Sequence, residues 1–467
     1  MKNRLPILLI VGVMCWPLIM PTMALFADDA TAPQLLTMDE SINRALSKNN
    51  MLRASQFGLK KAAWNQKYAW TQLFPTLSLN SRWMRIDDST LALRDFRRYL
   101  PEPLRSQIPE TVFQNSYYTE LAVSAPLFNG ALLNGLSVAR ANKRMAEKLN
   151  SSTREQVIFQ VISTYLGVLR SQDLLALQRE YQDLSRMNFE KAERLHNAGR
   201  NSRAEMLRWK VDYQQQKSVV VSSESGVRST RTALGRLISM DMNDNIIMES
   251  HIPDVLEKEA QKLSATDDQD ILEMIKLSDD ALIKANAALA AQKSSADIGK
   301  ALYRNSYANF MPNVNLTYTH AWFENNTIAL DNYSPKTLMV NVSMPLFTSF
   351  QNVAATRAAY FDFRQGEEQY YDALRNTKFV LTETVNKIIN LKVQRELLKT
   401  TVELSDHNYR IVEQQRDKGL VSNIDFIDAK LNLQNAKLDE ITTEYDFMTA
   451  MVELYYLLGK LETLVVE

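Results

Sequence analysis

Two acidic side chains follow a helix break near the C-terminal end of the sequence. Asp425 and Asp428 lie three residues apart in the segment RDKGLVSNIDFIDAK, shortly after Gly419 and Ser422. Two neighbouring carboxylates could favour or bind a cation, or they could complement the partial positive charge at the start of a helix. Asp425 also completes a Ser-x-x-Asp capping pattern with Ser422, whereas Asp428 lies one turn further on and is less easily explained by capping.

The remaining reactive residues form no recognisable catalytic or metal-binding pattern. No HExxH motif, phosphate-binding loop or nucleophile elbow occurs, and the histidine spacing fits no metal site. The only cysteine, Cys15, lies in the apolar N-terminal segment. The 54 basic and 54 acidic residues balance, which gives no signal for nucleic acid. We therefore expect no enzyme activity, no cofactor and no firm metal site, apart from a possible cation ring of Asp425 and Asp428.

The first 27 residues have the features of a secretory signal peptide. Lys2 and Arg4 precede an apolar stretch, and small residues allow cleavage after Ala24 or Ala27. A membrane anchor is the alternative, but the apolar stretch is short and contains two prolines. No later apolar run approaches the length of a spanning helix, so a membrane crossing would have to use strands.

Matching segments occur in the same order in both halves of the chain, which indicates two internal repeats. The matched pairs are LFPTLSLNSRW with FMPNVNLTYTH, APLFNGALLNGLSVARA with MPLFTSFQNVAATRAA, NAGRNSRAEML with DKGLVSNIDFI, and LGRL with LGKL. We therefore expect a first repeat over 28–240, a polar connector over 241–270 with little regularity, and a second repeat over 271–467.

Each repeat contains two segments in which apolar and polar residues alternate. They lie at about 76–88 and 117–127 in the first repeat, and at about 313–323 and 337–346 in the second. This period of two is typical of strands, and about ten residues is the length that crosses a bilayer when tilted. Aromatic residues toward the ends suit a membrane barrel. The strands taken alone fit a half-buried sheet of a soluble protein equally well.

Long helices are predicted after each strand pair. Residues 129–196 and 348–417 contain no proline, and the whole chain has only 12 glycines. Apolar residues such as Leu391, Leu398 and Val402 follow coiled-coil-like spacing. Such a helix would extend roughly 100 Å at 1.5 Å per residue. A secreted structural coiled-coil protein without channel activity is the alternative, but it does not explain the four alternating segments.

Each long helix is predicted to reverse at a tight turn, at 197–202 and at 417–422. A glycine suits the left-handed position after the first helix, and a Ser-x-x-Glu or Ser-x-x-Asp pattern begins the returning helix. The residues concerned are Gly199, Ser202 and Glu205 in the first turn, and Gly419, Ser422 and Asp425 in the second.

Four strands in a membrane cannot close into a barrel within one chain. Lipid forbids open sheet edges, and known barrels begin at eight strands. The chain would therefore have to oligomerise, and its long helices would extend the resulting tube on one side of the membrane.

This order of elements resembles the TolC family of outer-membrane channels over about residues 36–462. LTMDESINRALSKNNMLRA is similar to the N-terminal motif of that family, and KGLVSNIDFIDAKLNLQNAK is similar to its C-terminal Gly-x-x-Ser/Thr-x-x-Asp-x-x-Asp-Ala motif. The resemblance implies an α+β membrane protein that forms a homotrimer. Its four transmembrane strands per chain would build a 12-stranded β-barrel in the lipid of a Gram-negative outer membrane, above a periplasmic α-helical barrel.

The resemblance also implies a function and its partners. The chain would be the exit duct of an efflux or type I secretion system, working with a periplasmic adaptor and an inner-membrane RND, MFS or ABC pump. Asp425 and Asp428 would ring the periplasmic aperture, and the two turns would form the adaptor-facing tips. Some members close this entrance through an arginine just after the glycine. Here Leu420 and Val421 follow Gly419, so any latch must be built differently.

Overall fold

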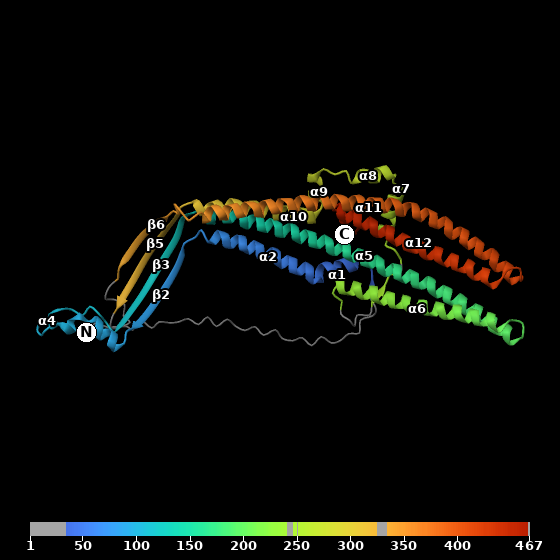
Figure 1. The fold of residues 1–467 in the computed structure, drawn as a ribbon, viewed down its shortest axis with the longest axis horizontal. Helices are drawn as coiled ribbons and strands as arrows, with labels where there is room; N and C mark the ends of the chain where they lie inside the picture. The colour runs from blue at the N-terminus through green and yellow to red at the C-terminus, as the bar shows by residue number, and fades with distance from the viewer. Residues whose placement is uncertain (1–33, 241–245, 250, 325–333, 466–467) are drawn as a thin grey trace.

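The chain forms an elongated rod with a sheet at one end and two helical hairpin turns at the other (Figure 1). The computed structural model describes residues 34–240, 246–249, 251–324 and 334–465. The predicted signal peptide at 1–27 lies outside the described residues. No helix within the described ranges combines the length and the apolarity needed to cross a membrane.

Four antiparallel strands form the sheet in the order β2-β3-β5-β6. They are β2 (Thr76–Arg85), β3 (Asn115–Asn129), β5 (Asn313–Glu324) and β6 (Lys336–Ser343). The long helices, the four-stranded sheet and the two-repeat order confirm the predicted fold class. β2 ends three residues before the predicted position 88, and β6 ends three residues before 346, because the backbone turns there toward a helix or a loop.

The strand register places the apolar residues of all four strands on one face of the sheet. Leu77 pairs with Val123, which pairs with Tyr318, which in turn pairs with Leu338. The neighbouring row on the opposite face contains Ser78 and its partners. Leu77 and Leu338 are each 68% exposed, so one chain leaves this apolar face uncovered. Neither edge strand, β2 or β6, pairs with a second strand among the described residues.

Four helices continue the four strands in the same side-by-side order. α2 (Asn50–Thr71) packs on α5 (Gly130–Asn197), α5 on α10 (Ala287–Ser306), and α10 on α11 (Gln351–Asp417). α5 and α11 have 68 and 67 residues, so each extends roughly 100 Å. Their far halves form hairpins with α6 (Arg203–Leu237) and α12 (Asn423–Leu457).

Equivalent asparagines fix the two repeats in the same way. Asn49 accepts hydrogen bonds from the first turn of α2, and its Nδ2 donates to the Leu237 carbonyl at 2.9 Å. Asn286 caps α10, and its Nδ2 donates to the Leu457 carbonyl at 3.2 Å. Each asparagine therefore joins the start of the helix that leads to the sheet, α2 or α10, to the end of the returning helix of its own repeat, α6 or α12. The short helices before these caps are α1 (Met38–Lys48) and α9 (Asp279–Ala285).

The prediction of little regularity over 241–270 was wrong for its described part. β4 (Ile246–Met248) pairs in parallel with β1 (Gln34–Leu36), and α7 (Asp254–Ala265) and α8 (Asp268–Met274) follow. α7 forms because Leu256, Ala260 and Leu263 lie on one face and pack into the main core. The predicted boundary at 270 falls inside α8.

Short helices also occur between β2 and β3, before β5 and after α12. The β2–β3 connection contains α3 (Asp88–Arg94), a 3₁₀ turn at Phe96–Tyr99 and α4 (Leu104–Gln107). Arg97 stabilises this connection because it bridges Asp95 and Glu110 at 2.8 and 3.0 Å. Further 3₁₀ turns occur at Tyr307–Phe310 and Leu461–Leu464.

Candidate functional site: the helical hairpin tips

The two hairpin turns have the same backbone geometry. Gly199 has φ of 68° and Gly419 has φ of 71°, a region that glycine enters without a steric cost from Cβ. The amide that follows each glycine donates back to the helix, from Arg200 to Leu195 at 2.8 Å and from Leu420 to Gln415 at 2.9 Å. These bonds satisfy carbonyls left open at the end of α5 and α11, as in a Schellman motif.

Serine caps begin both returning helices, but only the second cap is reciprocal. The Ser202 and Ser422 hydroxyls each accept from the amide three residues later, at 3.2 Å. The Asp425 carboxylate also accepts from the Ser422 amide at 3.1 Å, which completes a capping box. The predicted pairing of Ser202 with Glu205 therefore has only one of its two expected hydrogen bonds.

Glu205 instead joins the two tips to each other. Its carboxylate accepts a hydrogen bond from the Asn423 side-chain amide. Asn423 is the first residue of α12 and Glu205 lies in the first turn of α6. The starts of the two returning helices therefore contact each other directly.

The two predicted aperture acids have different local roles. The Asp425 carboxylate is engaged by the Ser422 amide and hydroxyl. Asp428 is exposed and makes no hydrogen bond or ion pair with any described residue. Within the described part of one chain no group of three potential metal ligands occurs.

Arg416 is held behind the second turn by a cation–π contact and a hydrogen bond. Its guanidinium lies 3.6 Å from the ring centroid of Phe426 and donates to the Asn188 Oδ1 at 3.2 Å. Phe426 is fully buried and forms a small core with Trp209 and Ala192. Arg416 thus ties α11 to both α5 and α12, whereas Lys418 is exposed.

Tyr409 packs against the same small core and remains a hydrogen-bond donor. Burial raises its pKa well above the ordinary value, and the neighbouring Glu413 carboxylate raises it further. Its hydroxyl therefore stays protonated and donates to Glu413 at 3.1 Å.

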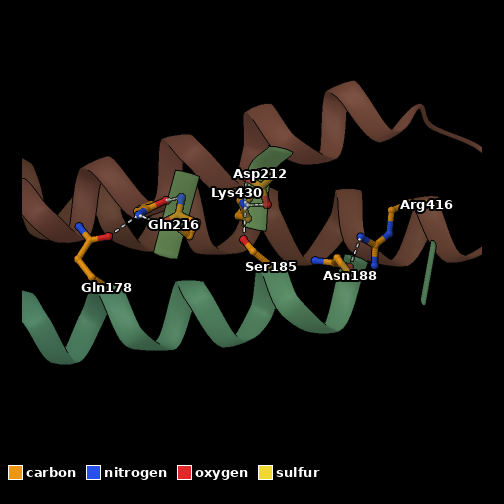
Figure 2. A network of polar contacts seen from close by, with 8 residues as sticks. Gln178, Ser185, Asn188, Asp212, Gln216, Arg416 and Lys430 are labelled. Carbon is orange, nitrogen blue, oxygen red and sulfur yellow. Dashed lines mark hydrogen bonds and ion pairs between the residues drawn. The ribbon is translucent and has the colours of Figure 1, made fainter. Parts of the chain in front are cut away.

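A row of buried polar side chains continues from this core between α5, α6 and α12 (Figure 2). The Lys430 ammonium lies 2.8 Å from both Asp212 oxygens and 3.1 Å from the Ser185 hydroxyl. One step further along, the Gln434 amide donates to Gln178 at 2.9 Å and contacts Gln216 at 3.3 Å. All these side chains are buried in the single chain.

This buried row was not predicted from the sequence, although a signal for it exists. Phe426, Lys430 and Leu433 are spaced by four and three residues, as in the core of a coiled coil. A lysine in that phase must be buried, and a buried lysine requires a partner. The partner Asp212 lies at the corresponding level of the other returning helix.

A known protein family matches both repeats of this chain. The model of the outer membrane efflux protein family matches residues 41–238 and 277–460, which is well over half of the sequence. The chain belongs to the outer membrane efflux protein family.

Individual proteins that this chain resembles are distant in sequence, and the solved structures among them are similar in fold. The alkaline protease secretion protein AprF of Pseudomonas aeruginosa is 19% identical over 362 residues, covering 77% of this chain and 73% of AprF. The CmeC outer membrane channel of Campylobacter jejuni superposes with a TM-score of 0.76 at 13% identity, covering 91% of this chain and 86% of CmeC. The outer membrane protein VceC of Vibrio cholerae gives 0.74 at 14% identity, covering 90% and 96%.

The family model covers the candidate site of this outer membrane efflux protein. Both hairpin turns and the buried polar row lie within the matched segments. The unmatched residues 239–276 contain β4, α7 and α8. Both hairpin tips therefore lie within the part of the chain that matches the family model.

Proposed function

We propose that this outer membrane efflux protein is the exit duct of a tripartite efflux or type I secretion system. It would conduct cargo passively from the periplasm of a Gram-negative cell to the exterior. One observation carries the proposal: a sheet with an exposed apolar face, whose two edge strands pair with no further described strand, continues into helices of 68 and 67 residues. Lipid would cover the apolar face, and the helices would reach into the periplasm.

The two unpaired edges support a closed homo-oligomer. In lipid each edge must find a partner, so β2 of one copy would pair with β6 of the next. Three copies would supply twelve strands, as in the family to which the chain belongs. The edge helices support the same arrangement, because Trp64 on α2 and Phe379 on α11 are 67% and 68% exposed in the single chain.

The hairpin tips are proposed to dock a periplasmic adaptor, which in turn would bind an inner-membrane pump. Leu420 and Ile424 at the second tip are 71% and 51% exposed, and Leu207 at the first is 44% exposed. Exposed apolar side chains grouped at one end of the rod would be covered by a protein partner. Gly199 and Gly419 set the turns, and Ser202, Glu205 and Ser422 hold the returning helices in place.

The aperture role is proposed for Asp428 first and for Asp425 second. Asp428 carries a carboxylate that is free of local partners, so in a closed oligomer several copies could ring one opening and favour cations. Asp425 would add its charge while it also caps α12. The proposed cargo is a secreted protein or a small toxic compound, and the sequence similarity to AprF favours the secreted protein.

Fractionation and conductance test the duct. We expect the protein in the outer-membrane fraction as heat-sensitive trimers that form ion-conducting channels in planar bilayers. A soluble monomer in the periplasm would overturn the proposal and leave a secreted structural coiled-coil protein. Export of a reporter cargo with AprF-type adaptor and pump partners, compared with drug-efflux partners, separates the two cargo classes.

A further inference from the structure

We propose a phospholipid headgroup site between α10 and α11, just below the sheet. The inference rests on the proposed function, because the site meets lipid only if the strands lie in a membrane. A groove of about 280 Å³ opens there. Its lining includes Tyr303, Tyr307, Phe310, Val353, Thr356 and Arg357.

Arg357 is the charged group of the groove. Its side chain is exposed and makes no ion pair or hydrogen bond with any described residue. A guanidinium presents several N–H donors in a plane, which matches two oxygens of a phosphodiester. The charge complementarity therefore favours an anionic, phosphate-bearing ligand.

Hydroxyl groups supply further donors beside this arginine. The Tyr303 and Tyr307 hydroxyls lie 2.7 Å apart. One hydrogen serves their mutual bond, so the second remains free to donate to a ligand. The Tyr307 hydrogen bond, with some burial, raises the pKa of Tyr303, which keeps that hydroxyl protonated. The Thr356 hydroxyl is buried and has no hydrogen-bond partner among the described residues.

The groove lies at the level where lipid headgroups are expected. Its 3₁₀ turn at Tyr307–Phe310 leads directly into β5, and α11 begins shortly after β6 (Figure 1). Phe347 and Phe350, in the connection between β6 and α11, are 74% and 71% exposed. Exposed aromatic side chains at the end of membrane strands mark the boundary between lipid and water.

The apolar part of the lining favours a lipid over free phosphate. Phe310 and Val353 are 39% and 47% exposed and flank the polar groups. They would contact the glycerol and the first acyl carbons, while Arg357 and the hydroxyls bind the phosphodiester. A small inorganic anion would leave these apolar groups in water.

Native mass spectrometry of the full-length, detergent-purified protein tests the site. The probes are dioctanoyl phosphatidylglycerol, dioctanoylglycerol without a phosphate, and inorganic phosphate. We expect Arg357→Gln and the double variant Tyr303→Phe with Tyr307→Phe to weaken phosphatidylglycerol binding at least about tenfold. Arg304→Gln is the matched control, because Arg304 is an exposed arginine on α10, next to Tyr303, but does not line the groove.

Several outcomes would overturn the site. Wild-type affinity in both groove variants would do so, as would an equal loss in the Arg304→Gln control. If dioctanoylglycerol binds as tightly as phosphatidylglycerol, the groove recognises only apolar groups and not the phosphate. If inorganic phosphate binds as tightly, the ligand is a free anion and not a lipid. Outer-membrane fractionation and conductance of the wild type are measured in parallel. A failure of the proposed exit-duct function is therefore distinguished from a failure of the lipid site.

Discussion

The Lys430 ammonium lies 2.8 Å from both carboxylate oxygens of Asp212, in a position where Lys430 is fully buried. The pair joins α12 of the second repeat to α6 of the first (Figure 2). The Ser185 hydroxyl on α5 adds a third contact at 3.1 Å. Three helices therefore meet at one charged layer inside an otherwise coiled-coil-like interface.

Removing one partner of this pair is expected to destabilise the protein more than removing both. Asp212→Ala leaves a buried ammonium without a counter-charge, which costs about 3–5 kcal/mol. Lys430→Met combined with Asp212→Leu should recover most of that loss, because both charges are replaced by apolar groups. Thermal unfolding of the detergent-solubilised protein measures both. Arg179→Ala breaks the exposed Arg179–Glu224 pair as the control and should cost less than about 1 kcal/mol.

Alanine substitutions at two glycines should differ because of one close contact. Gly419 and Gly459 have φ of 71° and 64°, so alanine strains the backbone at both by about 1–2 kcal/mol. A Cβ at position 419 meets nothing within 4 Å, whereas one at 459 would lie 2.0 Å from the Ala285 carbonyl oxygen. We expect Gly459→Ala to lower the Tm much further than Gly419→Ala. Equal Tm values would contradict the crowding at Ala285.

Substitutions of the two acids near the second tip should have different effects, because Asp425 caps a helix whereas Asp428 contributes only its charge. Asp425→Ala removes the reciprocal cap of α12 and should cost about 0.5–2 kcal/mol of stability. Asp425→Asn keeps an oxygen acceptor and should lose less. Asp428→Ala should leave the Tm unchanged but reduce cation selectivity and divalent block in planar bilayers. Unchanged selectivity in the double variant Asp425→Ala with Asp428→Ala would leave both acids without a role at the aperture.

Glu155 provides a pH-dependent test of the central core. Burial, and secondarily the charge of Glu462, raise its pKa above the ordinary 4.5 in the folded protein. The ionised carboxylate therefore costs stability at neutral pH, and this cost disappears as the pH falls through the raised pKa toward 4.5. We expect Glu155→Gln to raise the Tm at pH 7.5 and to match the wild type at pH 4.5. Glu147→Gln, in an exposed pair with Lys143 on the same helix, is the matched control for the substitution itself.

The strands and the hairpin turns could be predicted because local chemistry determines them. Alternating residues such as Leu77 and Leu79 must share a face in any strand, and the register gathers these faces across four strands. Likewise, Gly419 followed by Ser422 and Asp425 forms a helix end and a helix start from contacts within the turn. Neither the alternation within one strand nor the turn geometry depends on residues far away in the sequence.

The features that could not be predicted depend on distant partners. α7 and α8 are short and polar, and α7 is stabilised by packing its one apolar face on the central core. Glu205 looked like the second half of a capping box but contacts Asn423 across the repeats. The choice between a local and a distant partner is decided only by how the two hairpins lie together.

If the proposed trimer forms, the two sheet edges that are left unpaired among the described residues have a genetic consequence. A chain with a damaged β6 edge could still be accepted on its β2 side by a normal copy, since the edges belong to different strands. Such a chain would enter mixed assemblies and leave each one open. If three copies mix at random in equal amounts, only about one assembly in eight would contain normal chains alone. Alleles that damage one edge should therefore be dominant over the wild type, whereas alleles that prevent folding should be recessive.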